Sequence, residues 1–195
     1  MMNLKSFFLL FFLFVLLENI IADSVQHSVL LPFCEANRTI SFVETEIDTN
    51  ELKIEIITFK AFKKRMQSQK DNKLYIYNFW ATWCKPCVEE LPFFEQLAAT
   101  FPDEIEVILV SVDNPATAQE KLPAFIHKMQ IKSEVIVVQN FGDQAIATIN
   151  NNWDGEIPAT LFVNRQRGIN DFHAKSFTLN ELKVIVEQHC EQCGQ

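Results

Sequence analysis

The sequence predicts an α/β domain in which a central mixed sheet is flanked by helices. Short apolar runs, typical of strands buried on both faces, alternate with segments whose apolar residues recur at helical spacing. This alternation of strands and helices is the pattern of α/β proteins. The composition agrees, because 48% of the 195 residues are hydrophobic and 18 are Phe, whereas only four are Gly. Such a chain can bury a substantial core and is not of low complexity.

The first half of the domain is expected to hold a helix, a buried strand and a second helix. Thr58 is placed to cap the first helix. The run Leu74–Phe79 is mostly apolar on both faces, which predicts a strand inside the sheet. A helical pattern starts directly after this strand and continues to about Ala99.

The second half alternates in the same way. The strands that we expect there are Ile105–Val112, Val135–Val138, Ala159–Val163 and Ile169–His173. The last two flank a turn and are expected to pair as an antiparallel hairpin. Asn114 and Pro115 form a turn or the start of a short helix, Pro123 suits the first turn of a helix, and Asp143–Ile149 is a short helix candidate. Thr178 and Glu181 form a capping box that opens the last helix.

Three regions are expected along the chain. Residues 1–22 form a signal peptide or an uncleaved anchor, residues 23–50 an N-terminal extension, and residues 51–195 the folded domain. Lys5 precedes an apolar run of the length of a signal-peptide core, which is short for a membrane span. A buried N-terminal helix is the alternative. Export predicts a periplasmic or otherwise extracytoplasmic protein, which contacts the membrane only if this segment is retained as an anchor.

The net charge of −8 bears on the choice of partners. Nucleic-acid-binding domains neutralise phosphates with clustered Lys and Arg. An acidic domain repels phosphate backbones, so we expect no nucleic acid partner.

The five cysteines include two pairs with the spacing C-x-x-C. Cys84 and Cys87 form one pair, Cys190 and Cys193 form the other, and Cys34 is left over. In an oxidising compartment, each pair is expected to be catalytic, structural or bound to a metal.

The first pair lies where a buried strand ends and a helix begins. Unpaired N–H groups and the positive end of the helix dipole favour a thiolate on Cys84 at this position. Lys85 adds a positive charge, and Pro86 is tolerated in the first turn because it has no N–H. Cys87 lies deeper in the helix. The setting therefore predicts a nucleophile at Cys84 and a second thiol at Cys87 that resolves the mixed disulfide.

The segment from Asn78 to Pro92 closely resembles the active-site segment of TlpA/ResA-like thiol-disulfide oxidoreductases of the thioredoxin superfamily. Ile157–Val163 is similar to the cis-proline loop of that family and the strand after it. The resemblance covers about residues 55 to 188 and implies a thioredoxin-like fold. It also implies a TlpA/ResA-type helix-strand insertion in the long stretch between Cys87 and Pro158.

The resemblance implies catalytic roles by position. Cys84 matches the attacking cysteine, Cys87 the resolving cysteine, and Glu90 a glutamate proposed to assist proton transfer. Asn78 stands where thioredoxin has a buried aspartate that acts as acid and base, and asparagine is usual in the TlpA/ResA branch. Proton transfer would therefore fall to Glu90 or to water. A solvated helix residue is the alternative for Glu90.

The resemblance also implies a substrate-binding surface. Trp83 matches the aromatic residue beside the exposed sulfur. Pro158 matches the cis-proline opposite the disulfide. Ile157 matches the residue whose backbone can pair with a bound substrate strand. Trp80, in contrast, is expected to pack in the core.

The second pair lies at the opposite end of a helix. Cys190 and Cys193 continue the apolar spacing of the last helix at its C-terminus, where the dipole disfavours a thiolate. A structural disulfide, within the pair or to Cys34, is the main interpretation. Reduced thiols, a redox relay, or a metal site that includes His189 are the alternatives.

Together these features predict an exported thiol-disulfide oxidoreductase, acting as a reductase of exported protein thiols of the cytochrome c maturation type. Its partners would be exported protein thiols and disulfides and a membrane electron donor or acceptor. We expect no bound metal and no cofactor beyond the redox-active disulfide of Cys84 and Cys87. An oxidant or isomerase is the alternative, followed by a non-catalytic metal-binding module. No segment resembles the local motif of a peroxiredoxin cysteine, which disfavours a peroxidase.

Overall fold

A computed structural model of the chain describes residues 54–190. The predicted signal peptide or anchor, the N-terminal extension, Cys34 and Cys193 lie outside these residues. Within residues 54–190, no helix combines the length and the apolar character that crossing a membrane requires.

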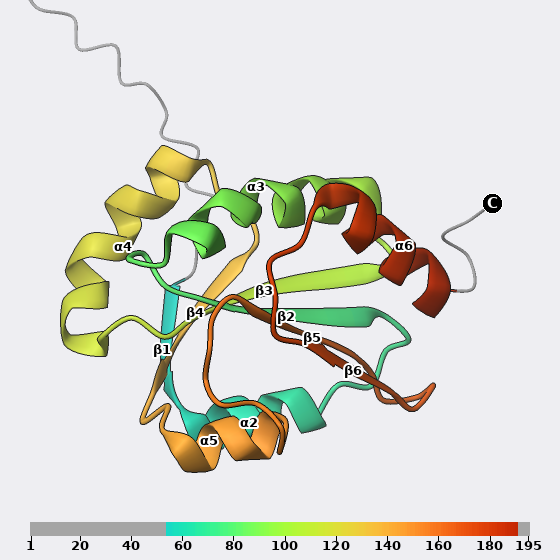
Figure 1. Cartoon of the computed structure of the whole chain (residues 1–195), viewed down its shortest axis with the longest axis horizontal. Helices are drawn as coiled ribbons and strands as arrows, with labels where there is room; N and C mark the ends of the chain where they lie inside the picture. The colour runs from blue at the N-terminus through green and yellow to red at the C-terminus, as the bar shows by residue number, and fades with distance from the viewer. Residues whose placement is uncertain (1–53, 191–195) are drawn as a thin grey trace, which may run out of the picture. The chain divides into compact units, whose positions relative to one another are not determined.

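Six strands form a mixed sheet in the order β1-β4-β3-β2-β5-β6 (Figure 1). The strands are β1 (Ile54–Thr58), β2 (Leu74–Trp80), β3 (Ile105–Ser111), β4 (Glu134–Gln139), β5 (Ala159–Asn164) and β6 (Ile169–His173). The pairs β1–β4, β4–β3 and β3–β2 are parallel, whereas β5 runs antiparallel to both β2 and β6. The predicted central mixed sheet is confirmed, and the predicted hairpin of the last two strands is its edge.

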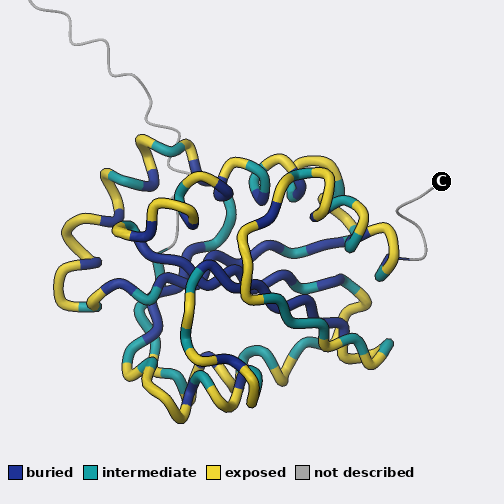
Figure 2. The backbone as a smooth tube through the Cα atoms, in the orientation of Figure 1, coloured by how far each residue is buried: buried dark blue, intermediate teal, exposed yellow. Residues whose placement is uncertain are grey.

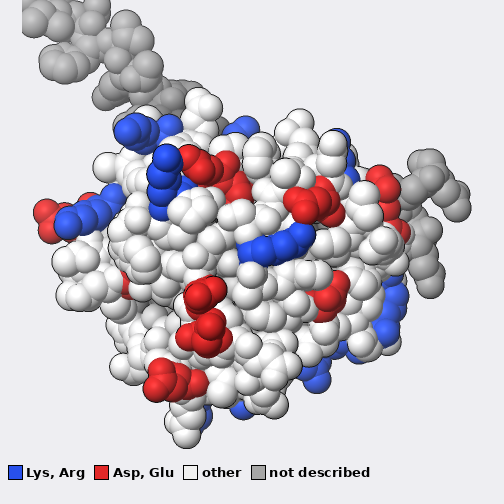
Figure 3. Space-filling model, in the orientation of Figure 1, with Lys and Arg blue, Asp and Glu red and all other residues white. Residues whose placement is uncertain are grey.

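Helices cover both faces of this sheet. They are α2 (Phe59–Gln67), α3 (Lys85–Thr100), α4 (Pro115–Met129), α5 (Asp143–Ile149) and α6 (Leu179–His189). Helices α3, α4 and α6 lie on one face, and α2 and α5 on the other (Figure 1). The buried side chains accordingly form two clusters, one on each side of the strands. Figure 2 shows that the central strands are mostly buried. On the face shown in Figure 3, acidic and basic side chains are interspersed with uncharged surface.

Two predicted helix starts are confirmed at the level of single hydrogen bonds. The hydroxyl of Thr58 accepts a hydrogen bond from the N–H of Ala61 and caps α2. At α6, Thr178 and Glu181 make both bonds of the capping box. Side-chain oxygens at these positions satisfy N–H groups that the first helical turn leaves unpaired.

The predicted start of α4 at Pro123 is wrong. The helix begins at Pro115 and is capped by Asn114, so that Pro123 lies inside it. Pro123 is exposed. Both prolines can occupy a first helical turn, but only Pro115 is preceded by a capping side chain.

The last helix is shorter than its apolar spacing suggests. Helix α6 ends at His189, and Cys190 adopts an extended backbone at the C-cap. Cys190 is nevertheless buried together with Leu182 and Val186. The spacing therefore predicted the buried face correctly and the helical backbone incorrectly. Between α3 and β5 the chain holds β3, α4, β4 and α5; the TlpA/ResA-type insertion in this stretch stays a prediction.

Candidate active site

Cys84 lies at the junction of strand and helix that the sequence predicts. It is the N-cap of α3, and its Sγ accepts a hydrogen bond from the N–H of Cys87 at 3.3 Å. A disulfide joins the two residues, whose Cα atoms are 5.3 Å apart. Cys84 is 6% exposed and Cys87 is fully buried. An incoming sulfur therefore reaches Cys84 first, as an attacking cysteine requires.

Lys85 and Pro86 form the exposed first turn of α3, as expected. The Nζ of Lys85 lies 3.6 Å from the Oε1 of Glu89, and both side chains are largely exposed. An exposed ion pair of this kind is weak. Even so, it places a negative charge beside the only lysine of this turn, which reduces the net positive potential near Cys84.

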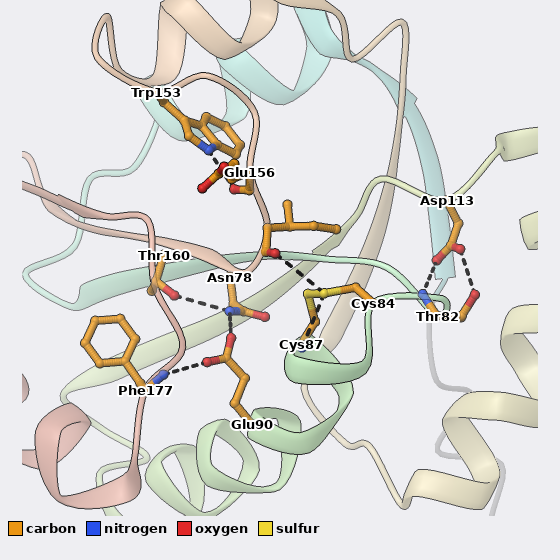
Figure 4. Close-up of a disulfide and its surroundings, with 11 residues drawn as sticks. Asn78, Thr82, Cys84, Cys87, Glu90, Asp113, Trp153, Glu156, Thr160 and Phe177 are labelled. Carbon is orange, nitrogen blue, oxygen red and sulfur yellow. Dashed lines mark hydrogen bonds between the residues drawn. A yellow bond between two sulfur atoms is a disulfide. The ribbon is translucent and has the colours of Figure 1, made fainter.

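The loop that carries Cys84 is held by Asp113, which follows β3 (Figure 4). Asp113 accepts hydrogen bonds from the N–H and the hydroxyl of Thr82, at 3.0 and 2.7 Å. The hydroxyl of Ser111 donates to the same carboxylate at 2.9 Å. Trp83 follows directly and is 70% exposed, so its ring lies on the surface beside Cys84. Trp80, in contrast, is fully buried as predicted.

A second loop approaches the disulfide from the start of β5. The peptide bond between Ile157 and Pro158 is cis. The carbonyl oxygen of Ile157 lies 3.7 Å from the Sγ of Cys84 (Figure 4). Pro158 is buried, while Ile157 is partly exposed. The structure thus brings both residues to the sulfur, and their role in binding substrate stays a prediction.

Glu90 is buried on the side of α3 that faces the sheet. Only 1% of the residue is exposed. Its Oε1 accepts a hydrogen bond from the Nδ2 of Asn78 and its Oε2 from the N–H of Phe177, both at 2.8 Å (Figure 4). The same Asn78 amide donates to the hydroxyl of Thr160 at 3.2 Å. A solvated position for Glu90 is therefore wrong.

Burial raises the pKa of Glu90 to about 7. The hydrogen bonds from the N–H of Phe177 and from Asn78 act in the opposite direction, because they stabilise the charged carboxylate. Cys87 and Glu90 are three residues apart on α3 and share a face of the helix. A carboxyl group with this pKa exchanges its proton near neutral pH.

The second cysteine pair is described only at Cys190. Cys190 is buried at the end of α6 and is disulfide-bonded; its pairing with Cys193 or with Cys34, both outside the described residues, stays a prediction. The Nε2 of His189 lies 3.0 Å from a carboxylate oxygen of Asp171, its partner in β6. Within residues 54–190, no three His, Cys, Asp or Glu side chains are grouped so that they could hold a metal ion.

Asp113 and Phe177 belong to the site but were not predicted from the sequence. Asp113 comes directly after a predicted strand. Parallel neighbouring strands end at the same edge of a sheet, so this position signals proximity to Cys84. Phe177 contributes its backbone N–H, for which the sequence carries no side-chain signal.

Comparisons with known proteins place this chain in a family. The AhpC/TSA family matches residues 49–172. The thioredoxin-like protein YneN of Bacillus subtilis is 26% identical over 127 residues, which cover 65% of this chain and 70% of that protein. The thiol-disulfide oxidoreductase ResA of Geobacillus kaustophilus is 24% identical over 133 residues, covering 68% of this chain and 69% of that protein.

Solved structures agree with the fold. A thioredoxin family thiol:disulfide interchange protein from Chlorobium tepidum superposes with a TM-score of 0.53 at 19% identity, covering 60% of this chain and 80% of that one. A thioredoxin-related protein from Neisseria meningitidis gives 0.54 at 18% identity, covering 63% and 88%. The chain belongs to the AhpC/TSA family, and it is a TlpA/ResA-like thiol-disulfide oxidoreductase with a thioredoxin-like fold.

Proposed function

We propose that this protein is exported and reduces disulfides in other exported polypeptides. The observation that supports the direction of electron flow is the buried carboxyl group of Glu90, three residues after Cys87 on α3. Above its pKa of about 7 this group is ionised, and its negative charge then disfavours a thiolate at Cys87. A less stabilised thiolate means a less stabilised dithiol form, and such a protein is a stronger reductant. The ion pair between Lys85 and Glu89 also favours a stronger reductant, because it lowers the positive potential that would stabilise the Cys84 thiolate.

The reduction proceeds in two exchange steps. The Cys84 thiolate attacks one sulfur of the substrate disulfide, and the other substrate sulfur leaves as a thiolate that takes a proton from water. Cys87 then attacks the Sγ of Cys84, which releases the remaining substrate sulfur. Two electrons pass to the substrate, which departs as two thiols. Cys84 and Cys87 end as the disulfide seen in this structure.

Glu90 serves the second step of this exchange. It accepts the proton of the Cys87 thiol as that sulfur attacks, and it returns the proton to the departing substrate thiolate. The pKa of Glu90, raised by burial to about 7, suits a group that must do both near neutral pH. Asn78 donates a hydrogen bond to this carboxyl and cannot itself exchange a proton in this way.

The substrate class that we infer is exported protein thiols of the kind maintained during cytochrome c maturation. Its support is the resemblance of the segment from Asn78 to Pro92 to the TlpA/ResA active site. A membrane protein that carries a dithiol would return the Cys84–Cys87 disulfide to the reduced state. Residues 1–22 would direct the chain across the membrane or anchor it there.

The test is turnover of a disulfide-bonded peptide by the reduced full-length protein. The wild type is expected to release peptide thiols, and Cys84→Ser to release none. Cys87→Ser retains the attacking sulfur but lacks the resolving one, so it should accumulate a mixed disulfide at Cys84. Peptide reduction that survives Cys84→Ser would refute the mechanism. Faster oxidation of a dithiol peptide by the disulfide form than reduction by the dithiol form would reverse the proposed direction.

A further inference from the structure

The side chain of Trp153 connects the sheet to the loop that presents Ile157 and Pro158. Trp153 is 5% exposed. Its indole N–H donates a hydrogen bond of 2.8 Å to the carbonyl oxygen of Glu156, next to Ile157 (Figure 4). The bond spans only three residues and closes the loop immediately before the carbonyl that faces Cys84.

The indole ring is held on three sides by aromatic residues. Its centroid lies 5.1 Å from that of Phe79, 5.3 Å from that of Phe172 and 5.8 Å from that of Phe141. Such pairs stabilise beyond the area that they bury. Phe79 belongs to β2, the strand that leads directly to Cys84. Strand β2 therefore supports both the loop, through the contact of Phe79 with Trp153, and the attacking sulfur of Cys84.

The backbone between Trp153 and Ile157 has little conformational freedom. The N–H of Trp153 donates to the carbonyl of Asn150 at 3.1 Å. Gly155 has a φ of +94°, and a Cβ at this position would lie 2.8 Å from the Cδ1 of Ile146 on α5. The backbone at Gly155 is thus pressed against α5 in a conformation that favours glycine.

We propose that Trp153 is a positioning residue for polypeptide substrates. It fixes the backbone of the partly exposed Ile157 relative to the Sγ of Cys84, so that an extended substrate segment paired with this backbone places its disulfide in line with the sulfur. Accurate placement of reacting groups accelerates a bimolecular exchange. The inference rests on the proposed function, because it concerns how a disulfide in a polypeptide chain is aligned. A small disulfide that does not pair with the loop needs no such alignment.

The experiment compares two disulfides as substrates of the reduced full-length protein. One is a disulfide-bonded peptide, and the other is dithionitrobenzoate, a small chromogenic disulfide. Trp153→Phe keeps an aromatic ring but removes the N–H donor. We expect its kcat/KM for the peptide to fall about fivefold, as loss of one hydrogen bond implies, with less than about a twofold change for the small disulfide.

Trp80→Phe is the matched control. Trp80 is also a buried indole, but it packs against Phe125 on the opposite face of the sheet from Trp153. Its N–H has no hydrogen-bond acceptor within the described residues. Trp80→Phe removes the same atoms from the core as Trp153→Phe but does not touch the loop. The ratio of kcat/KM for the peptide to kcat/KM for the small disulfide should therefore stay at the wild-type value. Thermal unfolding of both variants measures the general cost of losing an indole.

A second variant tests the loop without changing Trp153. Gly155→Ala introduces a Cβ against Ile146 and should displace the loop. We expect kcat/KM to fall for the peptide and not for the small disulfide, as in Trp153→Phe. Equal losses for both disulfides, no loss in either variant, or the same selective loss in Trp80→Phe would overturn the inference. A wild type that exchanges with the small disulfide but not with the peptide would instead refute the proposed function.

Discussion

The carboxyl group of Glu90 lies three residues after Cys87 on α3, buried between the amide of Asn78 and the main chain of Phe177. Its two hydrogen bonds compensate only part of the cost of burying a charge, so its pKa rises to about 7. With this pKa the carboxyl group gains and loses its proton near neutral pH.

Glu90→Gln removes the proton acceptor and keeps a side chain of similar size. We expect the rate of thiol-disulfide exchange to fall roughly 10- to 100-fold and its pH dependence to flatten between about pH 6 and 9. Stopped-flow measurement of peptide reduction across this range checks the prediction. Glu120→Gln removes one carboxylate from the exposed surface of α4 and serves as the control. Rates for Glu90→Gln equal to those of the wild type across the range would exclude a role in proton transfer.

The same carboxyl group also predicts how stability depends on pH. Because the pKa of Glu90 is raised from 4.5 to about 7 in the folded protein, the folded state binds the proton more tightly than the unfolded chain. The resulting stabilisation is fully present below about pH 4.5 and is lost as the pH rises through about 7. The shift corresponds to about 3 kcal/mol.

Urea unfolding of the oxidised protein measures this effect. The free energy of unfolding of the wild type, relative to that of Glu90→Gln, should decrease by up to about 3 kcal/mol between about pH 4.5 and 8. A difference that stays constant, or that grows with pH, would show that the carboxyl group is not held in its neutral form by burial.

At the scale of elements, the loop between β2 and α3 depends on the end of the neighbouring strand. Asp113→Ala should remove the acceptor of both Thr82 hydrogen bonds and cost about 1–3 kcal/mol of stability. Alkylation of Cys84 in the reduced protein should change in rate, because the loop that carries it loses its anchor. Asp113→Asn can still accept from the N–H of Thr82 and should retain most of the stability. If both variants behave like the wild type, the carboxylate does not hold the loop.

Helix α4 offers a test of the corrected helix boundary. Pro123 lies inside the helix, where it lacks an N–H and crowds the preceding turn. Pro123→Ala should therefore stabilise the protein by about 1–2 kcal/mol, the gain being reduced by the greater freedom of the unfolded chain. Pro115→Ala, in the first turn, should change stability much less. Equal effects of the two substitutions in denaturant unfolding would contradict the observed start of α4.

The elements differ in how far the sequence predicted them. Five of the six strands were predictable because buried runs such as Leu74–Phe79 are continuous apolar stretches with clear ends, whereas β1 (Ile54–Thr58) was not predicted. The start of α4 was not, because Pro115 and Pro123 both fit a first turn. The burial of Glu90 was also beyond reach, since it depends on the backbone of Phe177, 87 residues away. Only the folded sheet brings these two positions together.

At the scale of the whole molecule, the mixed sheet assembles the site. Parallel strands β2 and β3 end at one edge and deliver Cys84 and Asp113 there. Strand β5 runs antiparallel to β2, with Ala159 opposite Phe79, so its first residues lie beside the end of β2. This arrangement brings Pro158 to the disulfide. The two motifs were visible in the sequence, but their contact follows from the strand order.

The reduction potential of the Cys84–Cys87 pair decides whether this protein acts as a reductase or as an oxidant. It is measured in the full-length protein by equilibration with dithiothreitol or glutathione redox buffers, followed by alkylation and mass spectrometry of the active-site peptide. A reductase with Glu90 behind its disulfide should have a potential near that of thioredoxin, about −270 mV. A value near that of the oxidant DsbA, about −120 mV, would contradict the account.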